Sequence, residues 1–454
     1  MAESSGEKKL LDFKDIFSMG FGSAIGSGIF VLLGFGIAYT GKSVSVSLIA
    51  ACVMMFFAYF SQILMVSMFP LKGGTYGQST MLYPPIMVGI NAIFLLVIST
   101  SLAVYATGSA AYIAALYPKA EPFSKVISIG IITIFFLATI RGSKFLAMIQ
   151  NVMTGILVIS IIAFIIFGLP KMQSGYFGSD FFQNGLAGFI SASALMSYTC
   201  QGTTGGIALT AVTRNPTKTI PRAILADTLA LGILYALVGA VASGVLPYDQ
   251  VANQNLTVVA KVVFPSYLFY AFIIGGAIFA LTTSLLGAIA ALRYPIQQVA
   301  EDGWLPKFFT KKTKGGYPIV TQLTFYVIAI IPIILNINFD SIVSLVQAPT
   351  MLLGIYGNLV CFTLPKKYPE QWKKSIFHMP LPCFYLVMSL AVAVNAFVAY
   401  NLFISLTRAQ MIADVAALAV CVLIAFIRIR TKAVDVDKLL EAKHAAEMEA
   451  VEGN

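Results

Sequence analysis

Residues 20–30, GFGSAIGSGIF, place four glycines and two serines in the middle of an otherwise apolar segment. A helix that spans a membrane must satisfy its own backbone hydrogen bonds, because lipid offers no partners. Glycines crowded here favour local unwinding, which is tolerated only where the freed backbone lines a polar cavity or contacts a ligand. The predicted chemistry is therefore reversible binding by backbone groups. A first span broken near its middle is typical of secondary transporters.

The two ends of such a break differ in charge. We expect the first helix to stop near Ala24 and to restart near Gly28. The amides at the restarted end form the positive end of a half-helix dipole, which suits a carboxylate. The carbonyl groups freed at the stopped end accept hydrogen bonds from an ammonium group, so the break suits a zwitterion. The backbone groups concerned belong to Ser23, Ala24, Ile25, Gly26, Ser27 and Gly28.

A second run rich in glycine and threonine, YTCQGTTGG at residues 198–206, interrupts the sixth predicted span. Gly22 and Gly26 alone fit the spacing of closely packed helices, but a second break at the corresponding position favours a binding site. The second break lies five spans after the first, and because five is odd the second half would insert upside down relative to the first. We therefore predict an inverted repeat with the substrate between the two broken helices.

Five residues of the second break are candidates for contact with the substrate. Tyr198 is equally well a core residue, and the threonine hydroxyls could instead bond to the unwound turn. The candidates are Tyr198, Cys200, Gly202, Thr203 and Thr204.

The composition indicates an integral membrane protein. Of 454 residues, 58% are hydrophobic and 11% are charged, whereas soluble proteins carry about 25% charged residues. The net charge of +10 is spread over short loops, which argues against a nucleic-acid partner. The five cysteines lie in or beside apolar segments without metal-ligand spacing, so we expect free thiols. We expect no removable signal peptide.

The expected fold class is all-α, with twelve membrane-spanning helices of about 20 residues. The predicted spans are residues 13–40, 44–69, 85–116, 124–140, 145–169, 185–212, 222–246, 267–297, 319–337, 341–364, 379–403 and 409–429.

These spans predict five parts of the chain. The last part is expected to be a charged surface helix without transport chemistry. The parts are a cytoplasmic segment (1–12), a first repeat of five spans (13–169), a second, inverted repeat (185–364), two further spans (379–430) and a cytoplasmic tail (431–454).

Lysine and arginine predict the orientation, because cytoplasmic loops carry an excess of both. Most of the 29 lie on the side of the N-terminus. We therefore expect both termini in the cytoplasm and the protein in the plasma membrane, or in the inner membrane of a Gram-negative cell. The opposite side carries Lys42, Lys119, Lys125, Lys171, Lys261 and Arg408.

Four motifs resemble the amino acid–polyamine–organocation superfamily of permeases. Residues 22–30 are similar to its first-helix motif, and FPLKGGTY at 69–76 to its loop between helices two and three. NPTKTIPRA at 215–223 and AEDGWLP at 300–306 resemble its motifs after helices six and eight. The resemblance covers roughly 13–430. It implies the leucine-transporter-type fold, with helices 1 and 6 broken, and transport of amino acids or related amines.

Charged residues inside the spans are few. Some members of the superfamily with cationic substrates carry an acid where an ungapped count places Thr204, and its absence argues against a cationic substrate. Asp227 and Arg293 lie within about two turns of a predicted cytoplasmic end, and His378 and His444 lie outside the span interiors. Asp227 is interpreted as an interfacial residue paired with a loop arginine. We therefore expect no carboxylate or imidazole near the midplane to relay protons.

The resemblance also implies a candidate sodium site. Many sodium-independent relatives have a lysine where an ungapped count places Leu157, while sodium-coupled members use hydroxyls equivalent to Thr283 and Ser284 with carbonyls of the first break, here near Gly22 and Ile25. If a cation is coupled, we predict Na⁺ rather than a proton. Uncoupled exchange and facilitated uptake stay open.

The leading interpretation is a permease that moves a small neutral amino acid by alternating access, with the bilayer as its other partner. The alternative is an amine or polyamine antiporter, which predicts an anionic group in the pocket. A membrane enzyme is disfavoured, because no metal cluster, nucleophile–base pair or cofactor motif stands at a span end. A channel would need a continuous polar pore rather than a closed central site. The sequence does not predict the oligomeric state.

Overall fold

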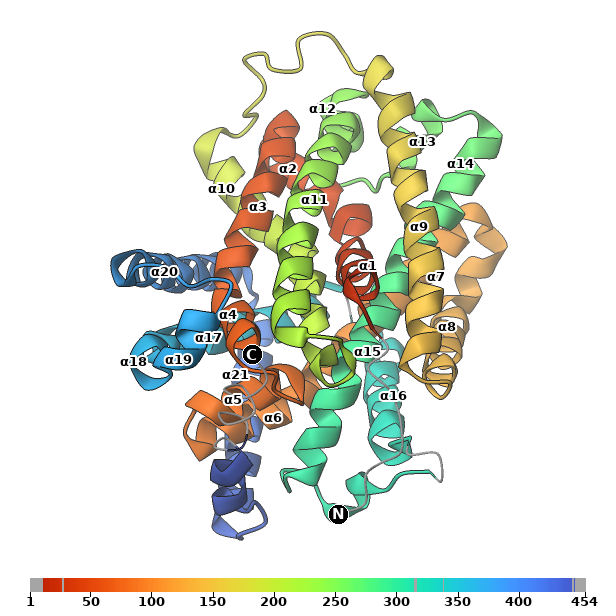
Figure 1. Ribbon diagram of the computed structural model, residues 1–454. Coiled ribbons are helices and arrows are strands. Elements are labelled where there is room, and N and C mark those ends of the chain that lie inside the picture. The colour runs from red at the N-terminus through yellow and green to blue at the C-terminus, as the bar shows by residue number, and fades with distance from the viewer. Residues whose placement is uncertain (1–10, 27, 314–316, 338, 443–444, 446–454) are drawn as a thin grey trace.

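The computed structural model describes residues 11–26, 28–313, 317–337, 339–442 and 445 (Figure 1). Within these residues the chain is all-helical, with one isolated bridge between Leu11 and Thr213 and no sheet. Nine of the described helical segments are long and apolar enough to cross a membrane. They are Phe13–Ala58, Pro85–Leu116, Pro118–Thr139, Phe145–Lys171, Pro216–Gly244, Ser266–Glu301, Ser341–Cys361, Leu381–Ile404 and Arg408–Arg430.

The first part of the chain runs from α1 to η5. Its elements are α1 (Phe13–Ala24), η1 (Gly28–Leu32), α2 (Leu33–Thr40), η2 (Gly41–Ser43), α3 (Val44–Ala58), α4 (Phe60–Met68), α5 (Gly74–Leu82), α6 (Pro85–Ile98), η3 (Ser99–Ser101), α7 (Leu102–Leu116), η4 (Pro118–Phe123), α8 (Ser124–Thr139), α9 (Ser143–Gly168) and η5 (Leu169–Lys171).

The second part runs from α10 to α21. Its elements are α10 (Gly185–Met196), η6 (Ser197–Val212), α11 (Pro216–Gly244), α12 (Tyr248–Val251), α13 (Thr257–Val263), α14 (Ser266–Phe272), η7 (Ile273–Ile278), α15 (Phe279–Glu301), η8 (Lys307–Thr310), α16 (Ile319–Ile334), α17 (Phe339–Cys361), α18 (Leu364–Lys367), α19 (Pro369–Lys374), α20 (Leu381–Ser405) and α21 (Arg408–Arg430).

The first helix lies at the centre of the bundle. α1 packs against η6, α9, α11 and α15, while α17 pairs with α20 and α21 with α6 toward the side of the molecule (Figure 1). A capping box at Asp12 and Asp15 starts α1, because carboxylates at these positions bind the free amides of the first turn. Four elements therefore converge on the glycine-rich stretch that the sequence singled out.

The first break occurs where the glycines predict it. α1 ends at Ala24, and a π-helical turn begins at Gly28 before α2 continues. Ile25 closes α1, its N–H donating to the Phe21 carbonyl at 3.0 Å. Ser27 lies outside the described residues. The break thus separates two helical segments of one span.

The second break takes a different form from the one predicted. The α-helix ends at Met196, as the glycines and threonines suggest, but the next 16 residues continue as a 3₁₀ helix instead of unwinding. Its hydroxyl groups bond to carbonyls three residues earlier, from Thr199 to Met196 at 2.7 Å and from Thr203 to Cys200 at 2.9 Å. Such side-chain bonds compete with α-helical pairing, and i to i+3 bonding is the 3₁₀ pattern.

The nine candidate spans differ from the twelve predicted for identifiable reasons. The first two predicted spans form one helical run, Phe13–Ala58. The sixth is divided between α10 and η6, and the ninth corresponds to α16, which has only 16 residues. A span across the hydrocarbon core needs about 20. The nine spans establish an integral membrane protein of several passes.

The start of the segment after α21 packs against the rest of the protein. Val434 and Leu439 are buried in a cluster with Trp304. The Arg428 guanidinium donates to the carbonyls of Gly303 and Leu305, at 3.0 Å from its Nε and 2.9 Å from an Nη respectively. Apolar burial and these bonds attach the start of the tail to the loop after α15.

Candidate substrate site

A cavity of about 200 Å³ lies between α1, η6 and α15, with α6 and α7 completing its wall. Hydroxyl, amide and apolar groups form its surface, and none of the described lining residues carries a charge. The polar lining residues are Ser23, Thr75, Ser101, Tyr105, Tyr198, Gln201, Thr204 and Ser284. The cavity therefore joins the two helices that the sequence predicts to be broken.

The structure brings part of the predicted site to this cavity. Ser23, Tyr198, Gly202 and Thr204 line it, together with Ser284 of the predicted cation site. Other predicted residues are packed behind the wall: Ala24, Ile25, Gly26, Gly28, Cys200 and Thr203.

Glycines bring the two interrupted helices into close contact. A side chain on Gly202 would collide with the backbone of Ser23 and Ala24, and one on Gly28 would collide with Thr199. A side chain on Gly26 would meet Ser284. These glycines therefore allow close helix packing, whether or not they also contribute to binding.

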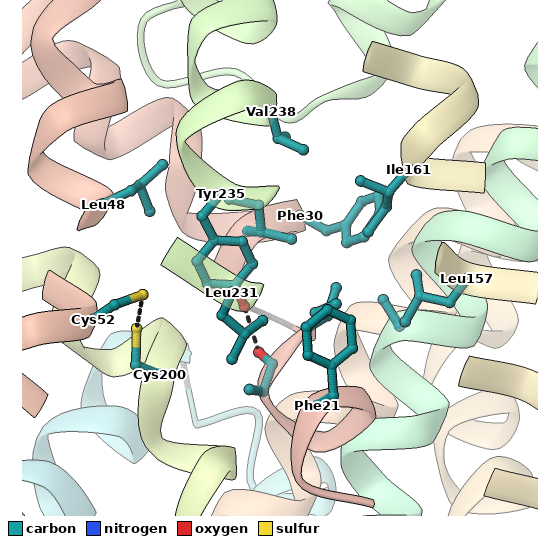
Figure 2. Close-up of a cluster of buried hydrophobic side chains, with 14 of the residues drawn as sticks. Phe21, Phe30, Leu48, Cys52, Leu157, Ile161, Cys200, Leu231, Tyr235 and Val238 are labelled. Atoms are coloured by element: carbon teal, nitrogen blue, oxygen red, sulfur yellow. Dashed lines mark hydrogen bonds between the residues drawn. The ribbon is translucent and has the colours of Figure 1, made fainter. Parts of the chain in front are cut away.

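Tyr235 of α11 connects both interruptions and was missed from the sequence (Figure 2). Its buried hydroxyl donates to the Ala24 carbonyl at 2.8 Å, and the Thr199 carbonyl is 3.2 Å away. Carbonyls at a helix end lack intrahelical partners, and this phenol supplies one. The only available signal was an unassigned tyrosine within a predicted span, since a buried hydroxyl needs a partner.

Gln201, Tyr105 and Ser101 are further cavity residues that the sequence did not single out. Gln201 lies inside the second glycine-rich run, so its position was the available signal. Tyr105 interacts through its hydroxyl with Tyr198, which makes Tyr198 a wall residue with a polar neighbour. The third predicted span therefore contributes to the site as well.

The proposed cation ligands lie together. The Thr283 hydroxyl is 2.9 Å from the Gly22 carbonyl, and the Ser284 hydroxyl is 2.7 Å from the Ser23 carbonyl. Both hydroxyls donate to the end of α1, so α15 also holds the broken helix in place. The four oxygen atoms suit a hard cation such as sodium. Among the described residues these hydroxyls bond to Gly22, Ala280 and Ser23 and not to the predicted carbonyl of Ile25. Leu157 is a fully buried core residue.

Two cysteines from different elements lie side by side. The sulfur atoms of Cys52 on α3 and Cys200 on η6 are 3.1 Å apart, and both side chains are buried (Figure 2). Their proximity was not foreseen, because 148 residues separate them. They place α3 directly against the start of the 3₁₀ segment.

A second cavity of about 100 Å³ adjoins the first near α5, and the two share Thr75, Leu95 and Ile98. Aromatic side chains pack around the restarted part of the first helix, outside the cavity lining. The Tyr112 hydroxyl donates to the Phe30 carbonyl at 2.7 Å, and the Phe30 ring lies 5.9 Å from that of Phe272. The space next to the central cavity therefore lies toward α5.

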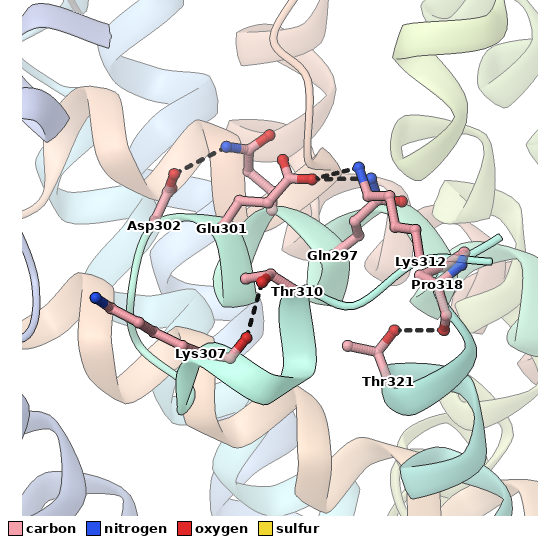
Figure 3. A network of polar contacts seen from close by, with 9 residues as sticks. Gln297, Glu301, Asp302, Lys307, Thr310, Lys312, Pro318 and Thr321 are labelled. Atoms are coloured by element: carbon pink, nitrogen blue, oxygen red, sulfur yellow. Dashed lines mark hydrogen bonds and ion pairs between the residues drawn. The ribbon is translucent and has the colours of Figure 1, made fainter. Parts of the chain in front are cut away.

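A polar network ties together the end of the bundle near α5. Asp302 accepts hydrogen bonds from the hydroxyl of Tyr76 at 2.7 Å and from Gln298 at 2.9 Å. Neighbouring Glu301 pairs with Lys312 at 2.7 Å (Figure 3). Burial is the largest influence on Asp302 and raises the pKa of its carboxyl above the ordinary value, although the bonds from Tyr76 and Gln298 oppose the shift.

One of the two charged residues inside the spans differs from expectation. Asp227 is 1% exposed, and its carboxylate has no hydrogen-bond partner among the described residues, so it is not an interfacial acid paired with an arginine. The distance in sequence to the nearest loop could not predict this burial, because neighbouring helices cover the face of α11 that carries Asp227. Arg293 lies over the rings of Tyr294 and Tyr317.

The family model described as amino acid permease matches residues 11–427. The chain belongs to the amino acid permease family. The match covers both interrupted helices and every element around the central cavity. The protein is accordingly a transporter with several membrane passes and not an enzyme, in agreement with the resemblance seen in the sequence.

Relatives of this chain are named for different substrates. The chain is 25% identical over 401 residues to the branched-chain amino acid permease BcaP of Bacillus subtilis, covering 82% of this chain and 84% of the relative. It is 26% identical to the methylthioribose transporter of the same organism, covering 84% and 86%. The putrescine transporter PotE of Escherichia coli is 25% identical, covering 44% and 47%. These names span several substrate classes.

Proposed function

We propose that this permease moves a small neutral amino acid across the plasma membrane by alternating access, with both termini in the cytoplasm. The observation that supports this most directly is the uncharged cavity between the two interrupted helices. Leaving a substrate's net charge unpaired in such a site costs several kcal/mol. A zwitterion avoids most of that cost, because both charges can meet backbone groups of the break.

Within this proposal the substrate's ends bind to the first break. The ammonium group meets carbonyls at the end of α1, near Ser23, and the carboxylate meets amides near Ser27 and Gly28. Gly28 packs on Thr199 in the present conformation. Binding at that end therefore requires η6 to shift relative to the restarted helix, which is the kind of movement that alternating access supplies.

The second cavity toward α5 and the aromatic packing around Phe30 correspond, in this proposal, to a state open to the cytoplasm. The proposed architecture keeps twelve spans, with α16 and the α10–η6 segment included. Ten of them form two inverted repeats of five, and two further spans follow. In this arrangement the substrate site lies near the bilayer midplane, between the two interrupted helices.

An amine or polyamine antiporter is the second candidate, and the similarity to putrescine transporters favours it. A diamine carries two positive charges and no carboxylate, so its site needs an anionic partner. The described residues that line the cavity supply none. The cavity chemistry therefore supports the neutral amino acid first.

We also propose a sodium site formed by the hydroxyls of Thr283 and Ser284 with carbonyls near Gly22 and Ile25. The support is the grouping of oxygen atoms between α15 and the end of α1. Hydroxyl and carbonyl oxygens without a carboxylate make a weak site, so the expected affinity is millimolar, roughly −4 kcal/mol at 1 mM.

The deciding experiment is uptake into proteoliposomes that contain the purified protein. A panel of unlabelled amino acids and diamines competes with radiolabelled leucine, alanine or putrescine, with sodium present or replaced by choline. We expect neutral amino acids to compete best. If lysine, arginine, glutamate or putrescine competes better than every neutral amino acid, the proposed substrate class is wrong.

A further inference from the structure

Asp227 is a buried acid that the proposed substrate site does not use. It lies on α11, and only 1% of its surface is exposed. Both carboxylate oxygens lack a hydrogen-bond partner in the part of the chain that the structure describes. Ionisable side chains inside a membrane protein are costly and mark ion or proton pathways by default.

The carboxylate faces the meeting point of the two interrupted helices. A side chain on Gly20 of α1 would collide with the Asp227 Oδ2 atom, and the Thr203 carbonyl of η6 lies 3.3 Å from the position of that added Cβ. Ser23, one turn further along α1, lines the cavity. The acid is therefore about one helical turn from the cavity wall and touches the backbone of a segment that must move during transport.

No countercharge meets this carboxylate within the described residues. α11 packs against α1, α3, α4, α9, α12, η2 and η6, and no described ionisable side chain on these elements or on α11 hydrogen-bonds to Asp227. Asp15 instead accepts from Asn151, and Lys42 pairs with Asp180. The ionisable residues on these elements and on the rest of α11, with those between α3 and α4 and between η6 and α11, are Lys14, Asp15, Lys42, Cys52, Tyr59, Lys144, Tyr198, Cys200, Arg214, Lys218, Arg222, Tyr235, Tyr248 and Asp249.

We propose that Asp227 binds one proton and carries it across the membrane with the substrate. This inference rests on the proposed transport function. An O–H bond forms at the carboxylate while the group is open to one side, and the proton is held while α1 and η6 cover it, because an unpaired buried charge is strongly disfavoured. When α1 and η6 separate from α11, water reaches the group and the proton leaves on the other side. No electrons are transferred.

This assignment revises the sequence-based expectation that no carboxylate is available to carry a proton. It uses a different group from the proposed sodium site, since Thr283 and Ser284 lie on α15 and Asp227 on α11. The two are separable if the proton is measured in choline buffer without sodium.

The test uses the full chain in proteoliposomes with a trapped pH-sensitive dye. A mixture of alanine, serine, valine, leucine and isoleucine is added outside in choline buffer. Wild-type protein should acidify the lumen as labelled amino acids enter. Asp227→Asn should lose this acidification yet still exchange internal for external amino acids. Asp414→Asn is the matched control, because Asp414 on α21 is also buried and unpartnered but lies outside the α1–η6 contact.

Uptake without acidification in the wild type, or unchanged acidification in Asp227→Asn, overturns the proposal. Infrared spectroscopy supplies a readout that needs no substrate. The wild type should show the C=O band of a protonated carboxyl group that Asp227→Asn removes and Asp414→Asn retains. If no amino acid enters, the proposed function fails for these substrates, and the band alone decides: its absence overturns the proton assignment.

Discussion

The hydroxyl of Tyr235 donates to the carbonyl of Ala24, the last residue of α1, at 2.8 Å. The same hydroxyl is 3.2 Å from the Thr199 carbonyl in η6. One side chain on α11 thus holds the end of the first interrupted helix close to the start of the second. Any movement that separates α1 from η6 must break at least one of these contacts.

Replacing Tyr235 by phenylalanine should lower both stability and transport. The Ala24 carbonyl would lose its buried donor, and an unsatisfied buried acceptor costs about 1 to 3 kcal/mol. Thermal unfolding of the detergent-solubilised protein and uptake in proteoliposomes measure the two effects. Tyr326→Phe is the control, because its hydroxyl bonds to Thr133 on the periphery. Equal behaviour of the two variants would contradict the role given to Tyr235.

Adding side chains at Gly28 should abolish substrate binding without preventing membrane insertion. An alanine there would collide with Thr199, and a valine would fill the space beside the restarted helix. Gly155→Ala is the matched control, because a Cβ at Gly155 meets no atom within 4 Å. Ligand-induced thermal stabilisation and surface expression measure the outcome. A ligand-bound structure with the substrate carboxylate far from Gly28 would contradict the proposed anion site.

The two interrupted helices differ in how far their form follows from the sequence. The glycines at 20–28 predicted the end of α1 correctly, because lipid offers no hydrogen-bond partners to the backbone groups that a break sets free. The form of η6 was not predictable, since it depends on threonine hydroxyls that bond three residues back. Tyr235 was missed, and Asp227 was misinterpreted, for another reason. Their roles follow from which helices pack against α11, and one sequence contains no direct record of that packing.

A carboxylate at Thr204 should change the preferred substrate. Thr204 lines the uncharged cavity, so Thr204→Asp adds the countercharge that a cationic substrate lacks. We expect lysine and putrescine to gain in competition assays and neutral amino acids to weaken. Thr204→Asn keeps the shape without the charge and should not favour cations. The proposal is contradicted if both variants shift selectivity alike.

Ser284→Ala should raise the sodium concentration needed to stabilise the protein. The variant removes one oxygen from the group near the Ser23 carbonyl. Thermal unfolding in increasing sodium chloride, against equal choline chloride, measures binding directly. Thr282→Ala is the control, because that hydroxyl bonds only within its own helix, to Ile278 and Phe279. Sodium responses that match in all three proteins would argue against this site.

Asp302 should make stability fall as pH rises. Burial raises the pKa of its carboxyl above 3.8, so the folded state binds the proton more tightly than the unfolded state. This contribution is fully present below about pH 4 and is lost as pH rises through the folded pKa. As pH rises from 4, the unfolding temperature of Asp302→Asn should therefore increase relative to that of the wild type. An unfolding temperature that changes with pH in the same way in both proteins would contradict this assignment.

The second cavity has a consequence for the speed of release. It adjoins the central cavity at Thr75, Leu95 and Ile98, and its wall includes the amide side chains of Gln62, Gln78 and Asn91. A solute leaving toward α5 therefore exchanges one set of polar partners for another before it reaches water. Where the second set of partners holds the solute about as well as the first, each step of release crosses a smaller free-energy barrier than direct passage into water would.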